Sequence, residues 1–137
     1  MSEIREQLRE LADGYDIQII YAFGSRAKEA FEMVEGKRVS LSPGPSDLDI
    51  GIKPERKLTV EEKVEIALAL EDIFGVHRVD LVVIPEVRTP LAFRIVTGEL
   101  LYASNPVYEA EYQLYVMRKA ADLLPYERER QKMILGF

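Results

Sequence analysis

Three aspartates carry the clearest chemistry in this sequence of 137 residues. Asp47 and Asp49 stand two positions apart in the alternating segment DLDIGIK, residues 47–53, in which aliphatic residues fill positions 48, 50 and 52. Because side chains alternate along a strand, both carboxylates share one face, with Cα atoms about 7 Å apart. Two negative charges at this spacing repel unless a cation lies between them. Mg²⁺ suits such a pair because it takes one or two carboxylates and fills its other positions with water and substrate phosphates.

A third carboxylate, Asp80, lies in the apolar segment RVDLVVI, residues 78–84. An unpaired charge is expensive to bury in such a strand. If the two strands are neighbours, Asp80 joins the pair, and three carboxylates around two cations promote in-line displacement at phosphorus. The residues alone leave other interpretations open. The pair could be the solvated face of an edge strand, Asp80 could be a salt-bridged strand end, and a sugar-transferring enzyme can also use a D-x-D pair.

Gly24 and Ser25 could hold a phosphate, because they directly follow a segment dense in Ile and Tyr and precede a helical segment. Glycine lets backbone N–H groups approach an anion, and a helix N-terminus favours negative charge. The serine hydroxyl adds a donor. A Gly-Ser pair is also a common turn, and Ser25 could simply cap the helix.

The composition excludes several other kinds of site. The chain has no cysteine and one histidine, His77, so thiolate metal sites, disulfides and His-dependent nucleophiles have no basis. The formal net charge is −6 without a basic cluster, so we expect no direct DNA binding. We also expect no membrane span, since no apolar run is long enough. The charged N-terminus is unlike a signal peptide, and the expected location is cytoplasmic.

The elements that position these residues follow from hydrophobic spacing and from Gly, Pro and capping signals. An α/β or α+β domain with a small sheet is expected. The expected strands are 16–23, 47–53, 78–84 and 100–102, with a strand-like piece at 38–41. The expected helices are 4–15, 27–34, 60–74, 90–96 and 106 to about 124. Gly14 would end the first of them, and Pro125 would break the last, which a final amphipathic piece follows. The helix 60–74 would be capped by Thr59 and Glu62, and its buried face would consist of Val60, Val64, Ala67, Leu70, Ile73 and Phe74.

Three segments taken together, FGSRA at 23–27, SDLDI at 46–50 and VDLVV at 79–83, are specific in order and placement. With them the chain resembles the polymerase-β-like nucleotidyltransferase superfamily, and most of all its minimal nucleotidyltransferase (MNT) members. The resemblance covers about residues 16–104. It implies that superfamily's fold, with a small mixed sheet flanked by helices and with C-terminal helices. The whole of 1–137 would be one domain, with its C-terminal helical region at about 105–137.

The resemblance implies a role for each site residue. Gly24 and Ser25 would hold the β- and γ-phosphates of ATP, and Arg26 matches the same pattern, with a surface salt bridge as its alternative. The metal-binding and catalytic residues would be Asp47, Asp49 and Asp80. The first two would hold both Mg²⁺ ions, or Mn²⁺ ions in their place, and the third would complete the site that activates the attacking hydroxyl.

The resemblance also implies a partner. Minimal members are antitoxins that transfer AMP from ATP onto a tyrosine of a HEPN-domain ribonuclease toxin. Two alternatives stay open: a nucleotidyltransferase acting on a small hydroxylated compound such as an aminoglycoside, and a binding module without catalysis. The last helix supports a partner, because it carries an apolar stripe from Val107 to Leu124 and a second stripe of tyrosines. Such a helix is either buried on two sides or docked on another chain.

One departure from the family pattern is an insertion at about 29–45. Twenty-one residues separate Ser25 from Asp47, roughly double what minimal members carry. Turn residues at both ends of 38–41 predict a short hairpin or lid at the mouth of the nucleotide site. The alternative is a passive surface insertion, which loop-closure entropy tolerates.

Overall fold

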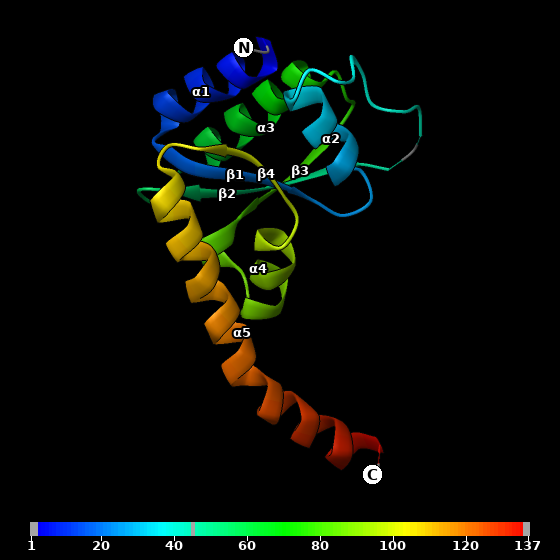
Figure 1. The fold of residues 1–137 in the computed structure, drawn as a ribbon, viewed down its shortest axis with the longest axis vertical. Helices are drawn as coiled ribbons and strands as arrows, with labels where there is room; N and C mark the ends of the chain where they lie inside the picture. The colour runs from blue at the N-terminus through cyan, green and yellow to red at the C-terminus, as the bar shows by residue number, and fades with distance from the viewer. Residues whose placement is uncertain (1–2, 45, 136–137) are drawn as a thin grey trace.

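The computed structural model of this chain has four strands in one mixed sheet, with helices on both faces (Figure 1). It describes residues 3–44 and 46–135, and side chains as far as Leu124. The elements in chain order are α1 (Glu3–Tyr15), β1 (Ile17–Phe23), α2 (Ala27–Val34), β2 (Leu48–Pro54), α3 (Val60–Phe74), β3 (Val79–Val83), the 3-10 turn η1 (Ile84–Glu86), α4 (Thr89–Val96), β4 (Glu99–Ala103) and α5 (Pro106–Leu135).

The strand order is β3-β2-β1-β4. Strand β1 lies antiparallel to both β2 and β4, while β2 and β3 are parallel and are connected through α3. The predicted fold class, a small mixed sheet flanked by helices, is therefore confirmed.

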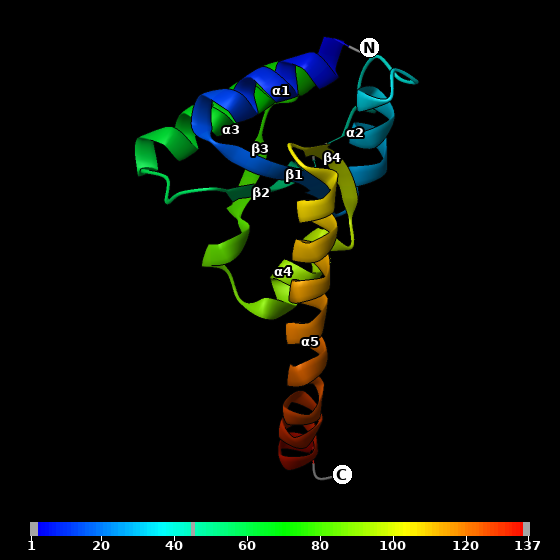
Figure 2. The same ribbon diagram turned by 60° about the vertical axis from the view of Figure 1, so that its left-hand side comes forward.

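The two faces of the sheet have separate cores. Helices α1, α2 and α3 cover one face, and α4 with the first part of α5 covers the other (Figures 1 and 2). Alternation along β1 sends Ile20 and Ala22 to the first core and Tyr21 and Phe23 to the second. In β2 the aliphatic residues go to the first core, so Asp49 is left on the α4–α5 face.

Helix α3 confirms the predicted capping signals. The Thr59 hydroxyl accepts a hydrogen bond from the Glu62 N–H, the Glu62 carboxylate accepts one from the Thr59 N–H, and Gly75 ends the helix with φ of 65°. The predicted buried face was wrong at its N-terminal end, where Val60 and Val64 are exposed. The first turns of α3 extend past the covered part of the sheet, and burial starts at Ile66.

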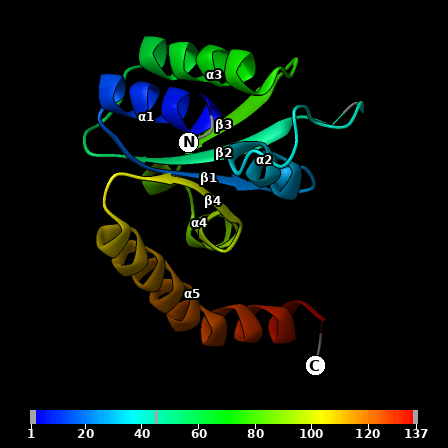
Figure 3. The same ribbon diagram turned by 45° about the horizontal axis from the view of Figure 1, so that its top comes forward.

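Helix α5 is one continuous helix from Pro106 to Leu135, so the predicted break at Pro125 and the separate last helix were wrong. A proline inside a helix removes one backbone hydrogen bond and bends the axis without necessarily ending the helix. Figure 3 shows the axis of α5 changing direction along its second half. Residues 136–137 of the predicted C-terminal region lie outside the described residues.

Two further predictions differ from the structure. Gly14 does not end α1, which runs to Tyr15, and Asp16 takes the left-handed conformation with φ of 57°, which Asp tolerates better than most residues. No strand forms at the strand-like residues 38–41. Strand β2, which follows this segment, is a central strand paired on both sides by β1 and β3, so the segment cannot pair with it. In the part of the chain that the structure describes, no helix combines the length and apolar character needed to cross a membrane.

Candidate active site

The register of the sheet brings the strand carboxylates together. Asp49 lies beside Asp80 in the parallel pairing of β2 with β3, and beside Phe23 in the antiparallel pairing of β2 with β1. Residues directly opposite each other in a sheet point to the same face. One row across the sheet is therefore formed by Phe23 at the end of β1, Asp49 in β2 and Asp80 in β3. Gly24 follows Phe23 directly in the chain.

Gly24 touches this row through Asp49. Its φ is 78°, a conformation that glycine adopts readily. A Cβ atom placed on Gly24 would lie 2.5 Å from Oδ2 of Asp49. The backbone conformation of this position favours glycine, and a side chain there would also have to displace the carboxylate of Asp49. The predicted phosphate turn and the predicted metal strand are in direct contact.

Asp47 lies one residue before β2 and is held differently. Its Oδ2 atom is 3.6 Å from Nε of Arg78, and the N–H of Leu48 donates to the Arg78 carbonyl at 3.2 Å. Within the described residues, no three acidic, histidine or cysteine side chains form a group that could hold a metal ion by themselves. The contact with Arg78 is a physical reason for the absence of such a group, because it draws the carboxylate of Asp47 toward a cation that the chain itself supplies.

The electrostatics of the cluster fall mainly on Asp49. Desolvation raises the pKa of the Asp49 carboxyl, and the neighbouring charges of Asp80 and Asp47 raise it further, while Arg94 on α4 acts in the opposite direction. Three carboxylates that repel one another accept a hard cation with oxygen ligands as their natural counter-charge. The register of Asp49 beside Asp80 thus fits a divalent cation such as Mg²⁺, whereas Asp47 pairs with Arg78 in this structure.

The start of α2 leaves donors available. The residue preceding the helix is Arg26, without a side-chain cap, so the alternative that Ser25 caps α2 was wrong. Ser25 is exposed, and none of the hydrogen bonds in the described part of the chain uses its hydroxyl. An uncapped helix N-terminus beside a free hydroxyl is an arrangement that binds phosphate oxygens.

Arg26 contacts the insertion. Its guanidinium donates to the carbonyl oxygen of Ser46 at 2.9 Å and also to that of Ser42. Glu29, one turn along α2, accepts a hydrogen bond from the Ser42 N–H at 2.7 Å and lies 3.6 Å from Arg38. These contacts fasten the described part of the segment between α2 and β2 as an irregular loop, so the predicted hairpin was wrong. A direct contact of Arg26 with nucleotide stays a prediction.

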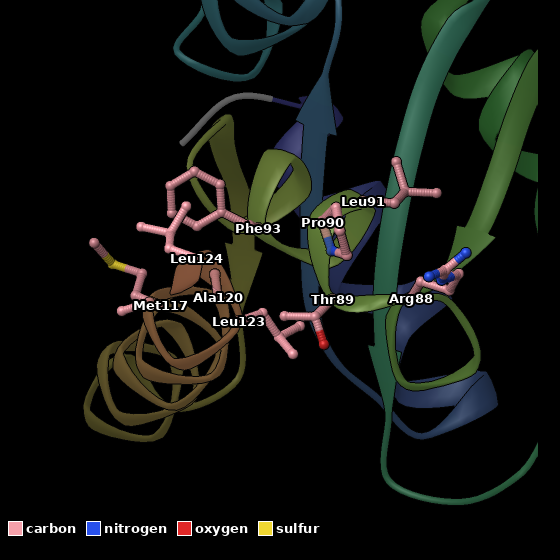
Figure 4. A pocket seen from close by; sticks show the side chains of 10 residues that line it. Arg88, Thr89, Pro90, Leu91, Phe93, Met117, Ala120, Leu123 and Leu124 are labelled. Carbon is pink, nitrogen blue, oxygen red and sulfur yellow. The ribbon is translucent and has the colours of Figure 1, made fainter. Parts of the chain in front are cut away.

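An apolar groove lies on the same side of the sheet, between α4 and α5, and has a volume of about 870 Å³. Figure 4 shows Phe93 of α4 beside Leu124 of α5 at this groove. None of its lining residues is acidic. The groove is therefore a surface separate from the carboxylate cluster.

Comparison with known proteins identifies the class that this fold and cluster define. The family described as "Polymerase beta, Nucleotidyltransferase" matches residues 6–107. The chain belongs to this nucleotidyltransferase family, as the three sequence segments predicted. A search of curated proteins finds no significant match.

Solved structures with this fold include toxin–antitoxin complexes. A chain of the tri-AMPylated Shewanella oneidensis HEPN toxin in complex with MNT antitoxin is 22% identical, with coverage of 97% of this chain and 94% of that one and a TM-score of 0.65. A chain of a toxin–antitoxin structure with AMP-PNP is also 22% identical, with 96% coverage of both chains and a TM-score of 0.66. A minimal nucleotidyltransferase is 24% identical over 72% of this chain and 87% of its own, with a TM-score of 0.50. These likenesses extend the agreement in fold beyond the family match.

Sequence reasoning missed two residues beside the cluster, Arg78 and Arg94. Arg78 stands two positions before Asp80, so its closeness to the cluster was accessible from the sequence, although its pairing with Asp47 was not. Arg94 lies on a helix that comes after all three aspartates. A single exposed arginine on an amphipathic helix has no pattern that distinguishes it from ordinary surface.

Proposed function

We propose that this chain transfers AMP from ATP to a hydroxyl group of a protein partner, a tyrosine of a HEPN-domain toxin, and thereby acts as its antitoxin. The contact between Gly24 and Asp49 carries the proposal. It joins a turn suited to phosphate and a row of carboxylates suited to a divalent cation. An adenylyl transferase needs both parts within reach of one triphosphate.

The proposed roles follow from the positions of the side chains. The hydroxyl of Ser25 and the N–H groups in the first turn of α2 that follow Ala27, whose own N–H donates to the Gly24 carbonyl, hold the outer phosphates. Asp47, Asp49 and Asp80 hold Mg²⁺ or Mn²⁺, which neutralises phosphate charge when bound. In the transfer the acceptor oxygen bonds to the α-phosphorus while the bond from that phosphorus to the bridging oxygen breaks, and pyrophosphate leaves. Asp80, exposed at the edge strand β3, is the carboxylate placed to take the hydroxyl proton.

A protein acceptor is supported by the surface of α5. Of the tyrosine stripe of this helix, Tyr108 and Tyr112 pack against the core beside the buried Val116, whereas Tyr115 is exposed. The other stripe is exposed, including Leu114 and Leu124. The described part of the chain covers the helix on one side only. Solved structures with this fold include MNT antitoxins in complex with HEPN toxins, and in one of these complexes the toxin is AMPylated.

The test uses the purified chain, ATP labelled at the α-phosphate, Mg²⁺ and the product of the adjacent gene. We expect label on a tyrosine of that product, identified by mass spectrometry, and none when Mg²⁺ is chelated. The variant carrying Asp47→Asn and Asp49→Asn should lose transfer while staying folded, because removing like charges does not destabilise the free protein.

The outcomes separate the alternatives. Label on an aminoglycoside-type compound instead of the protein would support a small-molecule transferase. Neutralisation of the partner without any label would support a binding module. Undiminished transfer by the double variant would contradict the assignment of the carboxylates.

A further inference from the structure

Three arginines surround the candidate site, and two of them are engaged within the chain. Arg26 donates to carbonyl oxygens of the loop between α2 and β2, and Arg78 lies against Asp47. Arg94 is exposed, and in the part of the chain whose side chains are described no carboxylate or carbonyl accepts a hydrogen bond from its guanidinium. It is therefore the arginine of the three that is available to a ligand.

Two close contacts fix the position of the last turn of α4, which carries Arg94, on the face of the sheet that holds Asp49. The next residue, Ile95, packs on Gly51, so closely that any side chain at Gly51 would overlap it. Gly51 lies two residues beyond Asp49 on the same face of β2. At the end of the helix, Gly98 approaches the backbone of Ala22 in the same way. The last turn of α4 is therefore pinned to the catalytic end of β1 and to the Asp49 face of the sheet.

The charge of Arg94 reaches the cluster from this position. Among the neighbouring charges that act on the Asp49 carboxyl, Arg94 is the one that lowers its pKa. The closeness that this requires agrees with the packing of α4. Helix α4 packs on the face of the sheet that carries Asp49, so Arg94 is placed on the same side as the carboxylates, where we place the α-phosphate of a nucleotide held by Gly24 and Ser25.

We propose that Arg94 is a further residue of the nucleotide site, whose guanidinium binds the α-phosphate of ATP and the negative charge that gathers there during transfer. This inference rests on the proposed function. Its chemistry is that of a charge-assisted hydrogen bond from a guanidinium to a phosphate oxygen. In a protein with net charge −6, a guanidinium at this position adds positive charge for a triphosphate beside that of the metal ions.

The test compares Arg94→Ala, Arg94→Gln and Arg94→Lys with the wild-type chain. A matched control is Arg118→Ala, which removes an exposed arginine from α5. Calorimetry with Mg²⁺ and a non-hydrolysable ATP analogue measures binding apart from activity, and single-turnover transfer measures the chemical step. We expect the analogue to bind about 10- to 100-fold more weakly to Arg94→Ala and Arg94→Gln, the range for a lost hydrogen bond between charged groups. Arg94→Lys should retain part of the affinity, and Arg118→Ala all of it.

The results distinguish this inference from the proposed function. Wild-type protein that binds no Mg²⁺–nucleotide would contradict the proposed function itself. Wild-type binding together with affinities and transfer rates within twofold for both Arg94→Ala and Arg94→Gln would overturn the role of Arg94 alone. Because Arg94 is exposed, we expect all four variants to fold, and thermal unfolding checks this. If Arg94→Ala were misfolded, the comparison of Arg94→Gln with Arg94→Lys would decide the question.

Discussion

At the scale of single residues, the contact of Gly24 with Asp49 makes a position-specific prediction. Gly24→Ala should weaken Mg²⁺–ATP binding at least about tenfold, because the added Cβ meets Oδ2 of Asp49 and because alanine disfavours positive φ. Calorimetry measures the affinity. Gly14→Ala is the matched control, since nothing lies within 4 Å of a Cβ at Gly14. That change should leave binding intact and stabilise α1 by up to about 1 kcal/mol. Equal affinities in the two variants would contradict the phosphate turn.

The raised pKa of Asp49 predicts how stability depends on pH. Burial and the charges of Asp80 and Asp47 disfavour the ionised carboxylate in the folded protein. Its unfavourable contribution is therefore full at neutral pH and disappears as pH falls through the folded pKa toward the unfolded value of about 4. The substitution Asp49→Asn should raise the melting temperature at pH 7 to 8, and the gain should vanish in acid.

Thermal unfolding over a pH series checks this prediction. The control is Asp122→Asn, at an exposed position of α5, for which we expect no comparable gain at neutral pH. Mg²⁺ should stabilise the wild-type chain and not Asp49→Asn. A lower melting temperature of Asp49→Asn at neutral pH would show that Asp49 stabilises the free protein, against the expected repulsion.

The sequence was sufficient to predict the carboxylates of the cluster, but it did not reveal the two arginines beside them. The pair Asp47 and Asp49 was recognisable because carboxylates are unusual at alternate positions of a strand. Asp80 required the assumption that two strands are neighbours, and the pairing of β2 with β3 confirms it. Arg78 and Arg94 depend on side-chain directions and on how α4 packs across the sheet. No local pattern encodes these.

At the scale of elements, the start of α3 is stabilised by contacts that have no part in the chemistry. Hydrogen bonds from Arg56 and from the Thr59 backbone lower the pKa of Glu62 to about 2. The stability that Glu62 contributes is present above its ordinary pKa of about 4.3 and is lost as pH falls toward 2. Thr59→Ala should lower the free energy of unfolding by about 1 kcal/mol through loss of the cap.

Denaturant unfolding of Thr59→Ala and of Glu62→Gln at pH 7 and pH 3 measures these contributions. The destabilisation of Glu62→Gln should shrink at the lower pH. Neither variant should change nucleotide affinity, because the cap lies at the far end of β2 from Asp49. A change in affinity would show that α3 is coupled to the site.

The loop between α2 and β2 gives a second prediction at this scale. Arg26→Ala removes two hydrogen bonds to loop carbonyls, at Ser42 and Ser46. Amide hydrogen exchange at residues 37–47 should become faster, while the melting temperature changes little, because a loop with few core contacts belongs to the less stable part of a fold. Arg38→Ala, which removes the ion pair to Glu29 and a hydrogen bond to the nearby Ser40 carbonyl, is the comparison within the loop itself. Unchanged exchange in Arg26→Ala would show that the loop is ordered by other contacts.

The elements themselves were largely predictable, because Gly, Pro and capping residues mark their ends. The errors have identifiable causes. The segment 38–41 has the residues of a strand, but it lies in an irregular loop beside β2, which is already paired on both sides. Pro125 is a strong local signal against a helix, yet α5 continues to Leu135. In both cases the local preference was overridden by the arrangement of the rest of the chain.

At the scale of the whole molecule, α5 separates a buried stripe from an exposed one. Val116 is 4% exposed and Leu114 is 51% exposed. Val116→Ala should therefore lower the free energy of unfolding by about 2 kcal/mol, whereas Leu114→Gln should leave it within about 0.5 kcal/mol of wild type. Chemical denaturation compares the two variants. A large loss in Leu114→Gln would mean that the exposed stripe is covered by a further contact in solution.

The parallel pairing of β2 with β3 has a consequence for the kinetics of folding. Asp80 can reach Asp49 only after the chain has crossed over through α3, because adjacent parallel strands cannot be joined by a tight turn. The repulsion among the carboxylates is therefore weak while β1, β2 and β4 assemble, and it arises at the step in which β3 docks. We expect protons, or a divalent cation if one binds there, to lower the barrier of that step by removing the repulsion. The refolding rate of this chain should then be sensitive to acid and to magnesium, even though most of its core is aliphatic.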